Sequence, residues 1–217
     1  MTPYYQDSAV TIYHGDCREI VPTLGRYDLL LTDPPYGIGI NKSNRLSVSR
    51  GFGGETWDDE APDMAPFLPI ADSHIVWGGN YFGLPPCKCF LVWDKKNDGR
   101  DFADCEFAWT SLPAVARIFR MRPQNMDGGK QHPTQKPLEL MRWCIQLAGG
   151  AAQTILDPFA GSGTTGRAAK DLGRKAVLIE REEKYCEISA RRMRQEVFDL
   201  SPPPEEPKHE QPEKGLF

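Results

Sequence analysis

The chain has 217 residues, which is enough to bury a substantial core, and one domain is the expected count. Hydrophobic residues make up 40% of the sequence and charged residues 26%, as in ordinary soluble globular proteins, and no apolar run approaches the ~18 residues of a membrane span. The N-terminus has no signal-peptide pattern, so we expect a cytoplasmic protein. The six cysteines form no CxxC pair, so we expect free thiols and no metal site.

The first half of the chain is predicted to form mainly strands. We expect strands at 9–13, 27–32, 73–77, 89–93 and 105–109, with helices at 18–24 and near 62–71. The strand at 27–32 is continuously apolar, which is typical of the centre of a parallel sheet. The strands at 89–93 and 105–109 flank a polar loop and predict a hairpin.

The second half alternates helix and strand. Helices are expected at 138–147, 164–172 and 182–198, and strands at 154–156 and 175–179. Pro137 stands at a helix start and Gly173 at a helix stop. Residues 201–217 contain five prolines and four glutamates, so we expect a disordered tail after a single domain over 1–200.

This alternation predicts an α/β fold with a doubly wound, mostly parallel sheet and one antiparallel hairpin strand. Ligands of such sheets bind where the strands end. Asp16, Asp33, Asp157 and Glu180 all follow predicted strands, so we expect them to gather at one edge.

The segment from Asp157 to Thr165, Asp-Pro-Phe-Ala-Gly-Ser-Gly-Thr-Thr, joins a strand to a helix. Its glycines let the backbone approach a ligand and leave the helix N-terminus open. Glu180 follows 23 residues after Asp157 and can accept hydrogen bonds from ribose hydroxyls. The pattern indicates a site for a nucleoside cofactor, and it lacks the GKS or GKT sequence of a Walker phosphate-binding loop. A tight strand–helix connection without a ligand is the simpler alternative.

The segment Asp33-Pro34-Pro35-Tyr36 predicts a site for an exocyclic amine. The Asp33 carboxylate and the Pro34 carbonyl can both accept hydrogen bonds from an NH₂ group, and the two prolines fix the direction of that carbonyl. Tyr36 offers a flat face on which a flipped base can stack. The alternative is that two prolines simply end a strand.

With both motifs present, the chain resembles the DNA amino-methyltransferases that make N6-methyladenine and N4-methylcytosine. The matching blocks are Gly15-Asp16, Asp33–Tyr36, His132-Pro133-Thr134-Gln135-Lys136-Pro137 and Asp157–Gly166. Because the catalytic motif precedes the cofactor motif, the resemblance is to the β-group, a circular permutation of the Rossmann-like methyltransferase fold. It implies S-adenosylmethionine (SAM) as cofactor and DNA as partner.

The resemblance also implies roles for individual residues. Asp157, Phe159, Gly161 and Gly163 would line the methionine and sugar of SAM, Glu180 the ribose, Asp16 the adenine ring, and Thr134 and Lys136 the SAM carboxylate. Asp33, Ser162 and Thr164 complete the expected cofactor site. Trp93-Asp94-Lys95 and Cys105-Glu106 match weaker blocks that line the target-base side.

Two segments are expected to contact DNA, 37–60 and 112–131. They carry local positive charge, from Lys42, Arg45 and Arg50 in the first and from Arg117, Arg120 and Arg122 in the second. Two solvated loops are the plainer interpretation. Both are short, which favours a degenerate recognition site or broad methylation.

In the resembling family, Asp at the first motif position usually accompanies adenine, so we expect N6-adenine methylation. N4-cytosine methylation is the main alternative, ahead of an RNA methyltransferase or a SAM- or DNA-binding regulator without catalysis. Members of the family are often dimers, which leaves a homodimer open for this chain.

Overall fold

The computed structural model describes residues 1–39, 58, 60–97, 103–125 and 135–195. Within these residues a nine-stranded sheet runs in the order β1-β2-β9-β8-β3-β4-β6-β5-β7. Its strands are β1 (Tyr5–Gln6), β2 (Val10–His14), β3 (Tyr27–Thr32), β4 (Ala71–Trp77), β5 (Cys89–Asp94), β6 (Cys105–Thr110), β7 (Arg117–Arg120), β8 (Thr154–Asp157) and β9 (Lys175–Glu180). Among the helices of the same residues, none has the length and apolar composition needed to cross a membrane.

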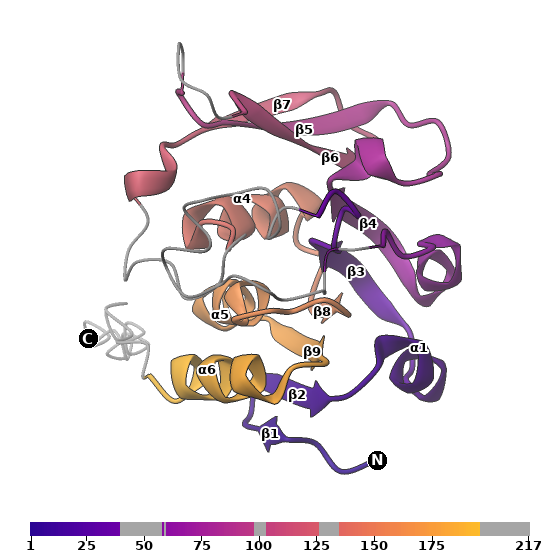
Figure 1. The fold of residues 1–217 in the computed structure, drawn as a ribbon, viewed down its shortest axis with the longest axis vertical. Coiled ribbons are helices and arrows are strands. Elements are labelled where there is room, and N and C mark those ends of the chain that lie inside the picture. The colour runs from indigo at the N-terminus through magenta and orange to yellow at the C-terminus, as the bar shows by residue number, and fades with distance from the viewer. Residues whose placement is uncertain (40–57, 59, 98–102, 126–134, 196–217) are drawn as a thin grey trace, which may run out of the picture.

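Helices cover both faces of this sheet (Figure 1). The α-helices are α1 (Cys17–Ile20), α4 (Leu138–Ala148), α5 (Thr164–Asp171) and α6 (Glu183–Met193), and the 3₁₀ helices are η1 (Val21–Thr23), η2 (Ala65–Ile70), η3 (Gly79–Tyr81) and η4 (Pro123–Asn125). Helices α4, α5 and α6 line one face, whereas α1 lies on the other side of the sheet (Figure 1). The doubly wound architecture predicted from the sequence is therefore confirmed.

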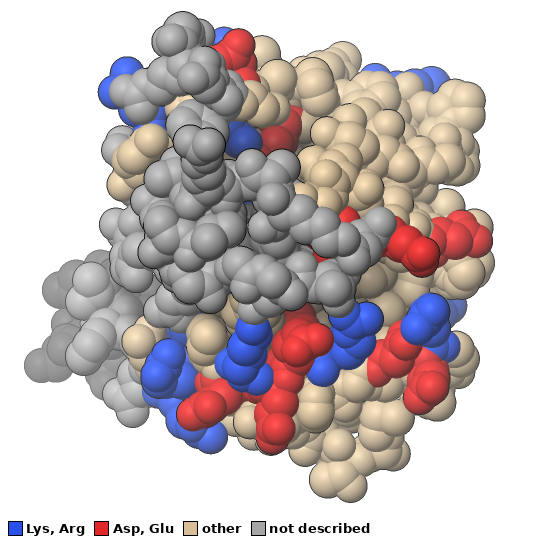
Figure 2. Space-filling view, in the orientation of Figure 1, with Lys and Arg blue, Asp and Glu red and all other residues tan. Residues whose placement is uncertain are grey.

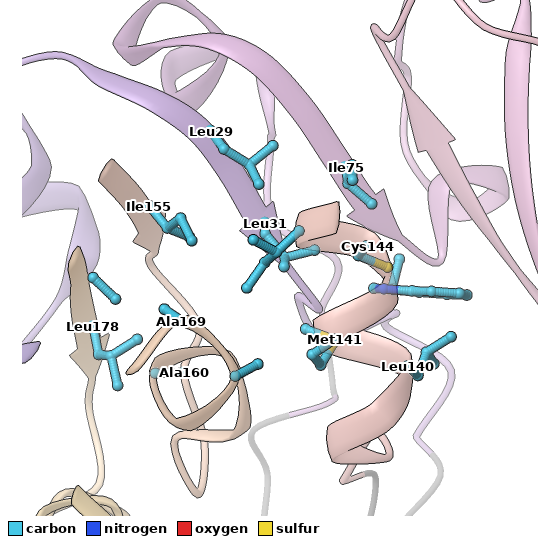
Figure 3. Packing of buried hydrophobic residues seen from close by; sticks show 14 of the residues in the cluster. Leu29, Leu31, Ile75, Leu140, Met141, Cys144, Ile155, Ala160, Ala169 and Leu178 are labelled. Atoms are coloured by element: carbon cyan, nitrogen blue, oxygen red, sulfur yellow. The ribbon is translucent and has the colours of Figure 1, made fainter. Parts of the chain in front are cut away.

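Most buried positions of the central strands are apolar, because both faces of the sheet are covered. In β3, Leu29 and Leu31 belong to the core under α4, α5 and α6, whereas Leu30 belongs to the core under α1 and η2. Successive side chains of a strand point to opposite faces, so each strand serves both cores. In Figure 3 the α4 side chains, among them Met141, point toward the strands that carry Leu31 and Ile75.

Strand direction also follows the prediction. The five consecutive strands β2, β9, β8, β3 and β4 are parallel to one another, and β6 pairs antiparallel with both β4 and β5. The predicted hairpin of β5 and β6 is thus confirmed. The two-residue strand β1 adds a third antiparallel pair, with β2 at the edge of the sheet, which the sequence did not indicate.

Three segments differ from the prediction. The helix expected near 62–71 is the 3₁₀ helix Ala65–Ile70, because Pro69 inside it cannot donate a backbone hydrogen bond. Within the predicted DNA-contacting loop 112–131, residues 117–120 form the edge strand β7, which pairs parallel with β5. Helix α6 ends at Met193, whereas the prediction ran to 198. Residues 40–57 of the other predicted loop, residues 196–198 and the tail 201–217 lie outside the described residues.

Candidate active site

The predicted site residues do gather at one edge of the sheet. Asp33 follows β3, Asp157 ends β8 and Glu180 ends β9, and these strands are parallel and adjacent in the sheet. Asp16 follows β2, whose loop is joined to β9 by a hydrogen bond from the Gly15 N–H to the Glu180 carbonyl (2.9 Å). Parallel alignment thus brings together motifs more than 100 residues apart in the chain.

A cavity of about 890 Å³ opens at this edge. Its polar lining includes Asp16, Asp33, Gly161 and Glu180. Its apolar lining includes Val21, Pro66, Phe67, Phe159 and Ile179, and the rings of Phe67 and Phe159 meet edge to face at 5.5 Å. A second hollow of about 50 Å³ is lined by Asp33, Lys136, Asp157, Phe159, Gly161, Ser162 and Thr164, among others. Asp33, Phe159 and Gly161 line both.

The Asp157 carboxylate braces the turn between β8 and α5. It accepts hydrogen bonds from the hydroxyls of Thr32 (2.7 Å) and Thr165 (2.5 Å) and from the Phe159 N–H (3.1 Å). Burial raises its pKa to about 6, although these three donors oppose the change. These hydrogen bonds show that Asp157 stabilises the loop between β8 and α5. Its predicted contact with the cofactor stays a prediction.

The glycines of this turn meet different demands. Gly161 (φ +51°) lines the cavity, and its N–H donates to Glu180 Oε2 at 2.8 Å. Gly163 (φ +77°) caps α5 and lies so close to α6 that an added Cβ would stand 2.0 Å from Ser189 Oγ. Gly163 is therefore required for helix packing, and it is not among the residues lining either hollow.

Arg192 of α6, which the sequence did not indicate, also stabilises this turn. Its guanidinium donates to the Ser162 carbonyl (2.7 Å) and to Thr164 Oγ1 (3.2 Å). Ser162 and Thr164 are buried, so these bonds satisfy polar groups that solvent barely reaches. No local signal in the sequence connects Arg192 to residues about 30 positions earlier.

Glu180 and Asp16 also line the cavity. Glu180 accepts hydrogen bonds from the N–H groups of Gly161 and Glu182, both at 2.8 Å, and burial raises its pKa above the ordinary value. Asp16 caps α1 through the Arg18 N–H (2.9 Å) and forms an ion pair with the Arg18 side chain. Arg18 lowers the pKa of Asp16.

Asp33 lines the cavity and belongs to a network of charged side chains. Its Oδ2 pairs with the Lys136 ammonium at 2.5 Å, and its Oδ1 accepts a hydrogen bond from the Tyr36 hydroxyl at 2.7 Å. Lys136 also pairs with Glu106 Oε2 at 2.9 Å, and the other Glu106 oxygen pairs with Lys95. The sequence predicts Lys136 beside the SAM carboxylate; the structure shows its charge engaged by Asp33 and Glu106.

The electrostatics of this network follow from its burial. Burial raises the pKa of Asp33 although the Lys136 ammonium opposes it, with Glu106 adding to the increase. Burial would also raise the pKa of Glu106, but Lys136 and Lys95 outweigh it and hold that pKa at about 2. Asp33 and Glu106 in turn raise the pKa of Lys136 against the effect of burial.

The Tyr36 ring is packed on more than one side. It stacks on the Tyr81 ring with centroids 4.9 Å apart and planes 16° from parallel, and Lys136 lies 5.5 Å from its centre. A Cβ on Gly78 would meet Tyr36 Cε1 at 2.1 Å. Tyr81, which is 45% exposed, thus covers one face of the ring that was predicted to receive a base.

The residues around the cavity fit SAM. Its volume lies within the ~300–1,000 Å³ range of small-molecule sites. Phe67, Phe159 and Val21 provide apolar walls for an adenine ring, and the Glu180 carboxylate provides acceptors for ribose hydroxyls. Thr134, a predicted ligand of the SAM carboxylate, lies outside the described residues.

The predicted DNA-binding residues are only partly placed. Lys42, Arg45 and Arg50 lie outside the described residues, whereas Arg117, Arg120 and Arg122 are exposed. Because 117–120 is a strand, Arg117 and Arg120 project to opposite faces, and Arg120 pairs with Asp94 at 3.3 Å. In the described part of the face in Figure 2, basic and acidic side chains alternate over the α6 region.

Comparisons with known proteins agree with this architecture. The profile of the N6/N4 DNA methylase family matches residues 76–191, more than half of the chain. The type II methyltransferase M.ScaI of Streptomyces caespitosus is 25% identical, over 91% of this chain and 86% of its own. The type II methyltransferase M.HinfI of Haemophilus influenzae is 43% identical over a shorter stretch, 34% of this chain and 21% of its own.

Two solved structures share the fold. The M1.HpyAVI–SAM complex superposes with a TM-score of 0.59 at 23% identity, over 86% of this chain and all of that one. The PvuII DNA methyltransferase, described as cytosine-N4-specific, gives a TM-score of 0.59 at 18% identity, over 92% and 90% of the two chains. The chain therefore belongs to the N6/N4 DNA methylase family, the DNA amino-methyltransferases that use S-adenosylmethionine.

Proposed function

We propose that the chain methylates the N6 amine of adenine in DNA, after the base has been flipped out of the duplex. The observation that carries this proposal is the position of Asp33. Its carboxylate lines the cofactor cavity and at the same time belongs to the charged network under Tyr36. An amine held by Asp33 is therefore held at the wall of the cavity that we assign to the cofactor.

SAM, when bound, supplies a methyl group on a positively charged sulfur. The protein's part is to hold the amine and to stabilise the positive charge that develops on its nitrogen. Asp33 accepts one N–H and the Pro34 carbonyl accepts the other, which directs the nitrogen lone pair toward the cofactor cavity. The raised pKa of Asp33 suits it to take up the proton that the methylated amine loses.

The target base is held by aromatic contact. Tyr36 and Tyr81 form a stacked pair beside Asp33, and the exposed Tyr81 ring extends that surface toward solvent. Stacking of a base on an aromatic side chain stabilises a flipped nucleotide by about 1–3 kcal/mol. The choice of adenine rests on the family resemblance, in which Asp at the first position of Asp33-Pro34-Pro35-Tyr36 usually accompanies adenine; the acceptor geometry suits the amines of adenine and cytosine equally.

The remaining predicted residues divide between cofactor and DNA. Glu180 binds the ribose, Asp16 faces the adenine end of the cavity, and Phe159 and Gly161 line its centre. The basic residues of 37–60 and 112–131 contact the phosphate backbone of either DNA strand. Short recognition segments favour a degenerate site.

The first experiment measures methyl transfer from labelled SAM to unmethylated duplex DNA, followed by nucleoside analysis. N6-methyladenine is the expected product; N4-methylcytosine would overturn the choice of base, and labelling of RNA alone would overturn DNA as substrate. Asp33→Asn should lower kcat by at least ~100-fold with little change in SAM affinity. Asp72→Asn is the matched control, because Asp72 forms only an exposed ion pair with Arg26.

A second experiment tests the cofactor side. Glu180→Gln removes the charge that we assign to the ribose contact, and a charge-assisted hydrogen bond of ~1.5–3 kcal/mol corresponds to a ~10–100-fold increase in the Kd for SAM. Calorimetry measures this Kd without DNA. An unchanged Kd would show that Glu180 only braces the loop through Gly161 and Glu182.

A further inference from the structure

We propose that Lys136 and Glu106 act together as positioning residues for Asp33. Glu106 holds the Lys136 ammonium group, and Lys136 fixes the Asp33 carboxylate where the target amine must bind. The inference rests on the proposed role of Asp33 and adds two residues to it, from parts of the chain that are far from Asp33 in sequence.

Four side chains form a row in which positive and negative charges alternate. Lys95 pairs with Glu106 Oε1, Glu106 Oε2 pairs with Lys136 at 2.9 Å, and Lys136 pairs with Asp33 Oδ2 at 2.5 Å. The Tyr36 hydroxyl lies 2.7 Å from Asp33 Oδ1 and 3.3 Å from Glu106 Oε2. Both oxygens of each carboxylate are thus engaged, which leaves Asp33 a single orientation.

The residues of this charged network belong to different elements, which come together only in the folded protein. Lys95 follows β5, Glu106 belongs to β6, and Lys136 precedes α4. The Lys136 side chain is 4% exposed and packs against the rings of Tyr36 and Trp77. A buried ammonium without partners is costly, so this position requires both carboxylates.

The groups facing Asp33 are Lys136, Glu106, Tyr36 and, from β8, Asp157. Removing the Lys136 charge leaves three carboxyls close together in a buried place, so Asp33 takes up a proton more readily and loses its ability to accept from the amine. Removing the Glu106 charge leaves Lys136 to Asp33 alone, so Asp33 stays ionised to lower pH. The two changes should move the titration of Asp33 in opposite directions.

The test uses Lys136→Met, Lys136→Arg and Glu106→Gln in the full chain. We expect Lys136→Met to lower single-turnover methyl transfer by at least ~100-fold and to move the acid limb of its pH profile upward. Glu106→Gln should move the same limb downward, and Lys136→Arg should restore the profile because its charge is retained. SAM affinity, measured by calorimetry, should change less than ~3-fold in all three.

Lys170→Met is the matched control. Lys170 pairs with Asp7 at 2.5 Å, on the β1 side of the sheet, so its loss should lower stability without moving the pH profile. Carbon-13 NMR of aspartate carboxyls, with Asp33→Asn to assign the signal, follows the titration of Asp33 directly and needs no activity. This measurement separates the two proposals. If the wild-type enzyme is inactive but the titration of Asp33 moves in opposite directions in Lys136→Met and Glu106→Gln, the proposed function alone is rejected.

Two results would overturn the inference. If Lys136→Met weakens SAM binding by ~10-fold or more and leaves the Asp33 titration in place, Lys136 is a cofactor ligand. If the Lys136→Met and Glu106→Gln titrations both coincide with the wild type, the network only supports the fold.

Discussion

The buried Asp157 carboxyl should make the protein less stable as pH rises. Burial raises its pKa from the ordinary 3.8 to about 6, so the folded protein binds this proton more tightly than the unfolded chain does. A carboxyl whose pKa is raised on folding stabilises the fold fully below its unfolded pKa and loses that contribution as pH rises through the folded pKa. The window runs from about pH 4 to just above pH 6.

The gap between 3.8 and about 6, at about 1.36 kcal/mol per pH unit, gives a total of about 3 kcal/mol. The linkage relation places roughly half of it, about 1.5 kcal/mol, between pH 5 and pH 8. Asp157→Asn removes the ionisation and keeps one oxygen for Thr32 and the Phe159 N–H. The Thr165 hydroxyl loses its acceptor, which costs about 1 kcal/mol at every pH.

Urea unfolding of wild type and Asp157→Asn, without SAM, measures the difference in free energy of unfolding from pH 5 to pH 8. Titrating groups that do not interact with Asp157 cancel in that difference, and the coupled Asp33 is the smallest of the causes given for the pKa of Asp157. We expect the variant to gain about 1.5 kcal/mol relative to wild type over this range. A difference that is flat, or that declines with pH, would refute the assignment of a raised pKa to Asp157.

Two glycine substitutions test close contacts. Gly78→Ala places a methyl 2.1 Å from Tyr36 Cε1 at a φ of +70°, so we expect displacement of Tyr36, a ~100-fold loss of methyl transfer and nearly unchanged SAM affinity. Gly83→Ala, with no atom within 4 Å, is its control, and equal activity of the two variants would argue against the role of Tyr36. Gly163→Ala, 2.0 Å from Ser189 Oγ at a φ of +77°, should cost about 2–4 kcal/mol in urea unfolding. Adding Ser189→Gly should recover at least ~1 kcal/mol, and strictly additive effects would show that the two residues do not compete for space.

The sheet and the position of its motifs were predictable because their signals are local. Continuous apolar runs such as 27–32 indicate buried parallel strands, and parallel strands end at one edge, so Asp33, Asp157 and Glu180 had to meet there. Strand β7 was missed because its sequence, Arg-Ile-Phe-Arg, is short and half charged.

The charged network could not be predicted in the same way. Glu106 reaches Lys136 only through the antiparallel register of β6 with β4 and β5, and register between distant strands leaves no mark on local sequence. Lys136 was recognised by its motif, but its partners depend on that same packing.

The strand order also governs when the site can form. Strand β2 pairs with β9, where Val10 faces Ala176, 166 positions later in the chain. Strand β3 likewise meets β8 only after residue 155. Pairings over such sequence distances slow folding, because closing a long loop costs entropy before any contact forms. During synthesis β2 and β3 can pair early with β1 and β4, but they must wait for β9 and β8 until most of the sheet has left the ribosome. Asp33 comes together with Asp157 and Glu180 only late in folding. A chain that has not completed these pairings lacks the site and exposes unpaired strand edges, which favours aggregation.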